Sequence, residues 1–166
     1  MVASGPVPAG PLRFHYHHGI APMMWVLIGL SGIELFVVHF LLAFWNGQVA
    51  LVASVLTLGT IAWLVALIRS MRRLPVLLDE LGLVMRVGTL RRHDVRRDNI
   101  AAVRTSWESG AEKAKSVSNL ALIAYPNVMI DLVQPMKSGR RDIRTIAHRL
   151  DDLPAFLGAL NHGRQP

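Results

Sequence analysis

The sequence of 166 residues contains no cysteine. This absence excludes disulfide bonds, thiolate zinc sites and cysteine nucleophiles. The sequence also lacks the GxSxG, P-loop, GxGxxG and HExxH patterns, which mark common hydrolase, nucleotide-binding and zinc-protease sites. The neighbouring pairs His93–Asp94 and Asp142–His148 do not form a recognisable catalytic set. We therefore expect that the protein is not an enzyme and that it carries no cofactor.

Charged residues are scarce, at 17 % of the chain against about 25 % in a typical soluble protein. Before residue 69 the only ones are Arg13 and Glu34. All other charges follow, and they give the chain its net charge of +7. An apolar first part and a basic second part predict two different environments.

Two long apolar runs occupy residues 20–45 and 49–68, within a predicted hairpin of residues 20–70. Each meets the length of about 20 residues that a bilayer core of roughly 30 Å requires. Residues 46–48 are the only break between the runs, and so short a connection predicts an antiparallel pair of transmembrane helices. Buried helices of a soluble protein are the alternative interpretation.

The orientation of this hairpin follows from the basic residues beside it. Arg13 precedes the first run, and Arg69, Arg72 and Arg73 follow the second, whereas the turn carries no charge. Because positive residues favour the cytoplasmic side, both termini are predicted to be cytoplasmic. The chain is thus expected to be a multi-pass membrane protein.

Polar side chains interrupt both apolar runs: Glu34, His39, Ser54, Thr57 and Thr60. A charge at membrane depth costs at least ~2.5 kcal/mol, so ionisable residues there deserve a functional hypothesis. Glu34 and His39 diverge by roughly 140° around their helix. The antiparallel register places Glu34 level with Thr60, and His39 level with the region of Ser54 and Val55.

We interpret these intramembrane residues as a polar clasp, in which Glu34 is either protonated or hydrogen-bonded across the hairpin and His39 is hydrogen-bonded likewise. Two alternatives remain. Glu34 and His39 belong either to a proton or ion relay, which would require oligomerisation, or to a polar surface used against a partner helix.

Residues 1–19 are predicted to be a flexible N-terminal tail, because residues 1–11 contain three prolines and two glycines. His15, His17 and His18 lie just before the first apolar run. A metal site or a haem ligand is one interpretation, but no acidic residue accompanies them in the sequence. Aromatic and histidine side chains also suit a membrane interface, so we expect no metal.

The pattern of apolar residues changes to a period of two after residue 74, which predicts strands in a cytoplasmic domain of residues 74–162. An apolar stripe of Leu153, Phe156, Leu157 and Leu160 then predicts a closing helix. Residues 109–118 are predicted to be an exposed loop. The seven predicted strands are residues 76–79, 83–87, 92–95, 100–106, 120–125, 128–133 and 143–150.

Three stretches of this domain, PVLLDELGLVMRVG, DNIAAVR and RLDDLPAFLGAL, carry a family resemblance. With the preceding hairpin, the domain resembles the bacterial pleckstrin-homology-like (PH-like) domains found behind two-helix hairpins in small bacterial membrane proteins. The resemblance implies a membrane α-helical hairpin plus an α+β domain: a seven-stranded bent sheet or barrel closed by a C-terminal helix. It also implies the bacterial inner membrane, and it supplies no active-site residue.

Pleckstrin-homology domains that hold phosphoinositides typically use basic residues around the first hairpin, but here the turn at residues 79–82 is short and acidic. We therefore expect contacts to anionic lipid rather than an inositol-phosphate pocket. A solvated basic face is the alternative. Nucleic-acid binding is not expected, because no aromatic RNP-like or helix-turn-helix pattern is present. The candidate lipid contacts are Arg72, Arg73, Arg91, Arg92, Arg96, Arg97, Arg140 and Arg141.

Together these patterns predict a non-enzymatic, membrane-anchored interaction or scaffold module. Its partners would be membrane lipid and either another protein or a second copy of the chain. The alternatives are a small ion- or proton-handling subunit that uses Glu34 and His39, and an enzyme of unknown type at the membrane surface.

Overall fold

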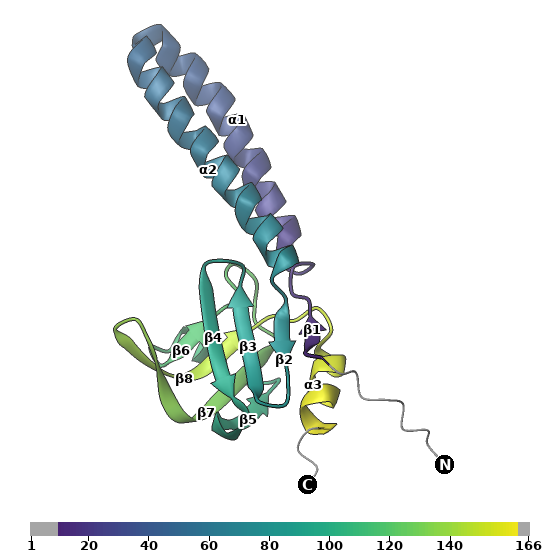
Figure 1. Ribbon diagram of the computed structural model, residues 1–166. Coiled ribbons are helices and arrows are strands. Elements are labelled where there is room, and N and C mark those ends of the chain that lie inside the picture. Colours follow the sequence, from purple (N-terminus) through teal and green to yellow (C-terminus); the bar gives the residue numbers. More distant parts are fainter. Residues whose placement is uncertain (1–9, 163–166) are drawn as a thin grey trace.

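A computed structural model describes residues 10–162, and residues 1–9 of the predicted tail lie outside the described part. Two long helices form a rod that stands on one end of a folded domain (Figure 1). The domain contains two sheets and a C-terminal helix, α3, at Leu153–His162. The predicted α+β layout with two apolar helices and a closing helix is confirmed.

The rod consists of α1 (Ala21–Trp45) and α2 (Gly47–Arg73). Only Asn46 separates them, so the connection is shorter than predicted. The Asn46 side chain accepts hydrogen bonds from the backbone N–H groups of Gln48 and Val49, and this cap starts α2 earlier than expected. The helix also continues beyond residue 68 to Arg73.

Both helices are long and apolar enough to cross a membrane. Of their most apolar stretches, 0 % of α1 and 11 % of α2 is buried inside the protein. Large apolar side chains therefore face outward along the rod, with Phe36 at 76 % exposure and Phe44 at 79 %. An apolar surface of this extent is unfavourable in water.

The base of the rod belongs to the core of the domain. Ile20, Met24, Leu67 and Met71 are buried in the same apolar cluster as the strands and α3. The hairpin and the domain therefore share one core and are not joined by a free linker.

The first sheet is antiparallel, in the order β1-β2-β3-β4. Phe14 of β1 pairs with Val76 and packs edge-on against Phe156 of α3, with ring centroids 5.2 Å apart. The predicted tail of residues 1–19 thus includes a strand of the domain, too short to show a period of two. The strands are β1 (Leu12–Phe14), β2 (Val76–Leu78), β3 (Gly82–Val87) and β4 (Arg91–Arg96).

The second sheet has the order β5-β7-β8-β6, in which β6 runs parallel to β8. The two sheets remain separate, so the single seven-stranded sheet or barrel was wrong. Short 3-10 helices at Arg97–Asn99 and Ala111–Lys113 lie in the connections. The strands are β5 (Ile100–Arg104), β6 (Val117–Asn119), β7 (Val128–Ser138) and β8 (Arg141–His148).

The segment 120–125 was predicted to be a strand and forms a turn-rich loop instead. Asn119 accepts a hydrogen bond from the backbone of Ala121, and Leu122 adopts a left-handed backbone with φ of 54°. This turn prevents a strand at 120–125. The short strand β6 (Val117–Asn119) comes just before it and begins within the predicted loop 109–118.

Candidate functional site at the base of the hairpin

Tyr16 fixes the segment that enters α1. Its side chain is fully buried. The hydroxyl donates a hydrogen bond to the carbonyl of Leu74 (3.0 Å) and accepts one from the N–H of Gly88 (2.7 Å). Burial raises the pKa of Tyr16, so the hydroxyl stays protonated and can donate. One side chain thus joins the N-terminal segment, the end of α2 and the β3–β4 turn.

His148 lies behind Tyr16 with ring centroids 4.9 Å apart. Its Nε2 is 2.8 Å from the carbonyl oxygen of Arg86, and its Nδ1 accepts the backbone N–H of Arg149. Because a carbonyl only accepts, Nε2 carries the proton of a neutral ring. Burial lowers the pKa of His148 to about 4, which agrees with this neutral form.

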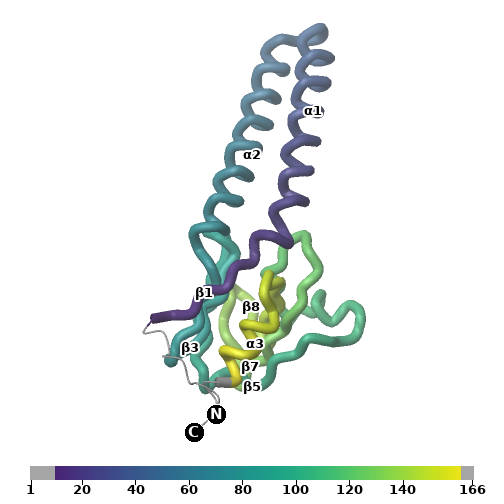
Figure 2. The backbone as a smooth tube through the Cα atoms, turned by 90° about the vertical axis from the view of Figure 1, so that its right-hand side faces the viewer, coloured from purple at the N-terminus to yellow at the C-terminus, as the bar shows by residue number. Residues whose placement is uncertain are grey.

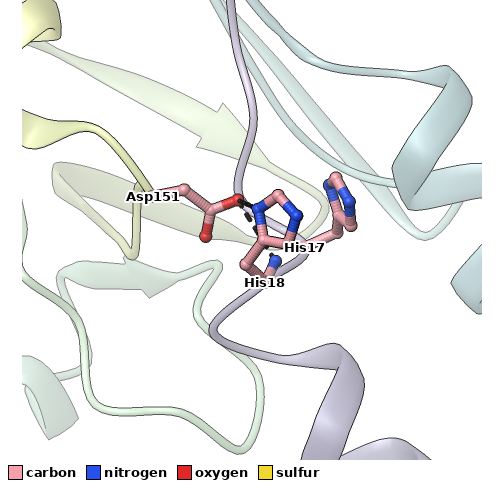
Figure 3. A group of neighbouring side chains, drawn as sticks. All are labelled: His17, His18 and Asp151. Atoms are coloured by element: carbon pink, nitrogen blue, oxygen red, sulfur yellow. Dashed lines mark hydrogen bonds and ion pairs between the residues drawn. The ribbon is translucent and has the colours of Figure 1, made fainter.

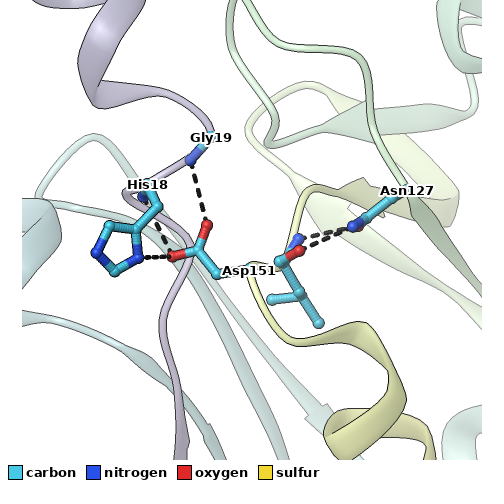
Figure 4. A network of polar contacts seen from close by, with 5 residues as sticks. His18, Gly19, Asn127 and Asp151 are labelled. Carbon is cyan, nitrogen blue, oxygen red and sulfur yellow. Dashed lines mark hydrogen bonds and ion pairs between the residues drawn. The ribbon is translucent and has the colours of Figure 1, made fainter.

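His17, His18 and Asp151 form a polar cluster beside this core (Figure 3). One carboxylate oxygen of Asp151 lies 3.0 Å from His18 Nδ1 and also accepts the backbone N–H of His18. The other oxygen accepts the N–H of Gly19 (Figure 4). The acidic partner that the histidines lack in the sequence is therefore supplied by the loop before α3.

The chemistry of this cluster is that of nitrogen and oxygen donors, with ligand atoms within 4.8 Å of one another. A divalent cation prefers such donors. However, His18 Nδ1 and both oxygens of Asp151 already have partners within the protein. Burial and the neighbouring His18 lower the pKa of His17, so that ring is neutral at pH 7. The bonds of Asp151 to His18 and Gly19 link the start of α1 to the loop before α3, and we call this contact the His18–Asp151 link.

A second set of contacts holds the loop 120–126 next to the His18–Asp151 link. Asn127 exchanges two hydrogen bonds with the backbone of Leu150 (Figure 4). The guanidinium of Arg149 donates to the carbonyl of Tyr125 (3.0 Å). Arg149 also packs so closely on Gly19 that a Cβ at position 19 would collide with it. The loop is thereby joined to the start of α1.

Within the hairpin, His39 Nδ1 and Ser54 Oγ are 2.6 Å apart. Ser54 donates its own proton to the carbonyl of Ala50, so it accepts the proton of His39. Thr57 and Thr60 also donate to carbonyls of α2. His39 and Ser54 therefore form a polar link between the two helices.

Glu34 behaves differently from the predicted clasp. It lies on an exposed face of α1. Thr60, its predicted partner, uses its hydroxyl on the carbonyl of Leu56. Within residues 10–162, Glu34 makes no hydrogen bond or ion pair. Of the two forms expected for Glu34, the hydrogen bond across the hairpin is therefore absent from the described residues, because its face of α1 turns away from α2.

The basic residues fall into two groups. Arg72 and Arg73 end α2, and Arg91 follows the β3–β4 turn, where Gly88 packs on α2. Of the other five, three bond to groups of the domain and two lie at the β7–β8 turn. Arg92 pairs with Asp94, and Arg96 pairs with Asp98. Arg97 donates to the carbonyls of Asp79 and Leu160. Arg140 and Arg141 lie at the β7–β8 turn, and this turn is away from the hairpin (Figure 1).

The sequence did not point to Asp151 or Asn127 as parts of this site. Asp151 and Asp152 both read as caps of the last helix. In the structure Asp152 caps that helix by accepting the N–H of Ala155. One aspartate is enough to cap a helix, so the second aspartate at this position was the sequence feature that could have pointed to another role for Asp151.

Comparison of the chain with protein-family models, curated proteins and solved structures finds no match.

Proposed function

We propose that this chain is a non-enzymatic interaction module of the bacterial inner membrane. The hairpin crosses the membrane, and a PH-like domain is held against the cytoplasmic surface. The observation that carries this proposal is the shared core, in which the lower ends of both helices pack with the strands of the domain.

The apolar surface of the rod supports a membrane location. Its outward side chains are large and apolar over most of the length of both helices. Placing them in lipid removes this surface from water, whereas a soluble monomer would leave it exposed.

The shared core also supports a scaffold. Met24 and Met71 are buried with the domain. Tyr16, which precedes α1, forms hydrogen bonds with Leu74 and Gly88, which follow α2. A domain fixed in this way presents its surface to the membrane plane at a constant angle. Such preorganisation lowers the cost of binding a partner that lies in the same membrane.

Two features favour association with another chain. Glu34 has a polar group on the outer surface of the hairpin, where a partner helix would satisfy it. In the domain, β4 is the last strand of its sheet, so an extended segment can pair with its free edge. We propose self-association or binding to a second membrane protein through these surfaces, with Arg72, Arg73 and Arg91 beside anionic lipid.

The orientation can be tested with single cysteines, because the chain has none of its own. A cysteine replacing Gln48 at the hairpin tip should react with a membrane-impermeant maleimide added to intact cells. A cysteine replacing Leu81 in the domain should react only after lysis. Reaction of Leu81→Cys and protection of Gln48→Cys in intact cells would overturn the proposed orientation.

A further inference from the structure

The loop 120–126 exposes apolar side chains that a soluble domain would not need. Leu122 is 40 % exposed, Ile123 43 % and Tyr125 57 %. Leu122 also has a left-handed backbone with φ of 54°, a conformation that residues other than glycine rarely adopt. The loop therefore forms an apolar projection with three exposed side chains.

The position of the loop is set by bonds to the start of the hairpin. Arg149 donates to the carbonyl of Tyr125 and packs on Gly19, two residues before α1. Figure 2 shows the green segment before β7 rising to the lower end of α1. The projection therefore points to the same side of the domain as the helices.

The length of α1 places this end of the domain at the membrane interface. A helix of 25 residues spans about 37 Å, against roughly 30 Å for the hydrocarbon core. Its surplus lies in the headgroup zone if the hairpin is centred in the membrane. The start of α1, and the loop bonded to it, would then lie at the depth of that zone.

We propose that the loop 120–126 inserts Leu122 and Ile123 into the headgroup–acyl boundary as a second membrane anchor. This inference rests on the proposed membrane location of the hairpin. The occupant is a lipid surface, because Arg149 links the loop to the segment that enters α1, and Arg72 and Arg73 lie at the end of the neighbouring α2.

An aromatic pair supports this assignment. Trp107 stacks on Tyr125 with ring centroids 6.0 Å apart, and its indole N–H donates to the Tyr125 hydroxyl (3.1 Å). Tryptophan and tyrosine are enriched at membrane interfaces, since their rings are apolar and their edges are polar. The pair thus adds interface-seeking groups beside Leu122 and Ile123.

The test uses the full chain in nanodiscs of phosphatidylcholine and phosphatidylglycerol. An environment-sensitive fluorophore is attached to Leu122→Cys or Ile123→Cys. The matched control is Leu81→Cys, another exposed leucine. It lies in the β2–β3 turn, whereas the other end of β3 faces α2. We expect blue-shifted emission at 122 and 123, with several-fold stronger quenching by lipids that carry a shallow spin label than at 81.

A fourth probe at Phe36→Cys, on the exposed surface of α1, separates the two proposals. If position 36 is quenched while 122 and 123 emit as in water, the loop anchor is wrong and the transmembrane hairpin stands. If position 36 also emits as in water, the membrane proposal itself fails. A blue shift at 122 and 123 that appears only in native membranes would assign the loop to a protein partner and overturn the lipid assignment.

Discussion

Asp151 accepts the backbone N–H of His18, a residue 133 positions earlier in the chain. The same carboxylate accepts the N–H of Gly19. In return, the backbone N–H of Asp151 donates to the carbonyl of His15. These bonds tie the entry of α1 to the last connection of the domain, so the orientation of the hairpin depends on the far end of the sequence.

Asp151→Ala should destabilise the domain by about 1–2 kcal/mol, because two backbone donors lose their acceptor. Asp151→Asn should lose less, since an amide oxygen still accepts. The measurement is thermal unfolding of the purified full chain in detergent. Asp142→Ala, which removes an exposed acid from β8, is the matched control. Equal melting temperatures for the Asp151 and Asp142 variants would contradict a stabilising role of the His18–Asp151 link.

Acid should destabilise the domain through His148. Burial holds its pKa at about 4, against its usual 6.5, so the unfolded chain binds the proton first. The stabilisation is complete above pH 6.5 and is lost as the pH falls toward 4, by up to about 3 kcal/mol from this one group. Denaturant unfolding between pH 7.5 and 4 checks this slope. The slope should become shallower in His148→Gln, and an unchanged slope would assign the acid sensitivity to other groups.

The bond between His39 and Ser54 should contribute a small coupling to the hairpin. Interhelical hydrogen bonds in membranes average about 0.6 kcal/mol. A double-mutant cycle of His39→Ala and Ser54→Ala in detergent measures this coupling. Thr57→Ala in place of Ser54→Ala is the control, because Thr57 bonds only to its own helix. Coupling of His39 to Thr57 as strong as to Ser54 would argue against a specific bond.

Glu34 should promote self-association in the membrane. Leu30 lies one turn away on the same face of α1, whereas Phe36 lies on the opposite face. Under oxidation in native membranes, Leu30→Cys should form crosslinked dimers faster than Phe36→Cys. Adding Glu34→Leu should slow the Leu30→Cys crosslink, and adding Glu34→Gln should slow it less, because the amide can still form hydrogen bonds. Equal crosslinking at both positions would exclude this face as the contact between copies.

Only some of the eight candidate arginines should attract anionic lipid. Replacing Arg72, Arg73 and Arg91 with Gln should reduce recruitment of phosphatidylglycerol around the full chain in nanodiscs, because these residues lie at the hairpin end of the domain. Replacing Arg140 and Arg141 should have little effect. Energy transfer from the protein to fluorescent phosphatidylglycerol measures both. The larger effect from Arg140 and Arg141 would reverse the assigned membrane-facing side.

The sequence by itself determined the main elements of this protein. The long apolar runs predicted two helices, because a helix needs only a continuous stretch of suitable residues. The apolar stripe that includes Phe156 and Leu160 predicted α3 for the same reason. The antiparallel register of the hairpin also followed from its short turn, which places His39 level with the region of Ser54 and Val55, and His39 bonds to Ser54.

Only the tertiary structure decided how the N-terminal segment and the site are built. β1 is three residues long and becomes a strand by pairing with β2, so its own pattern carries little information. The face of α1 that turns toward α2 decides that His39 finds a partner and that Glu34 does not. Asp151 and His18 meet only in the folded domain, because they are 133 positions apart and no local pattern relates residues at that distance.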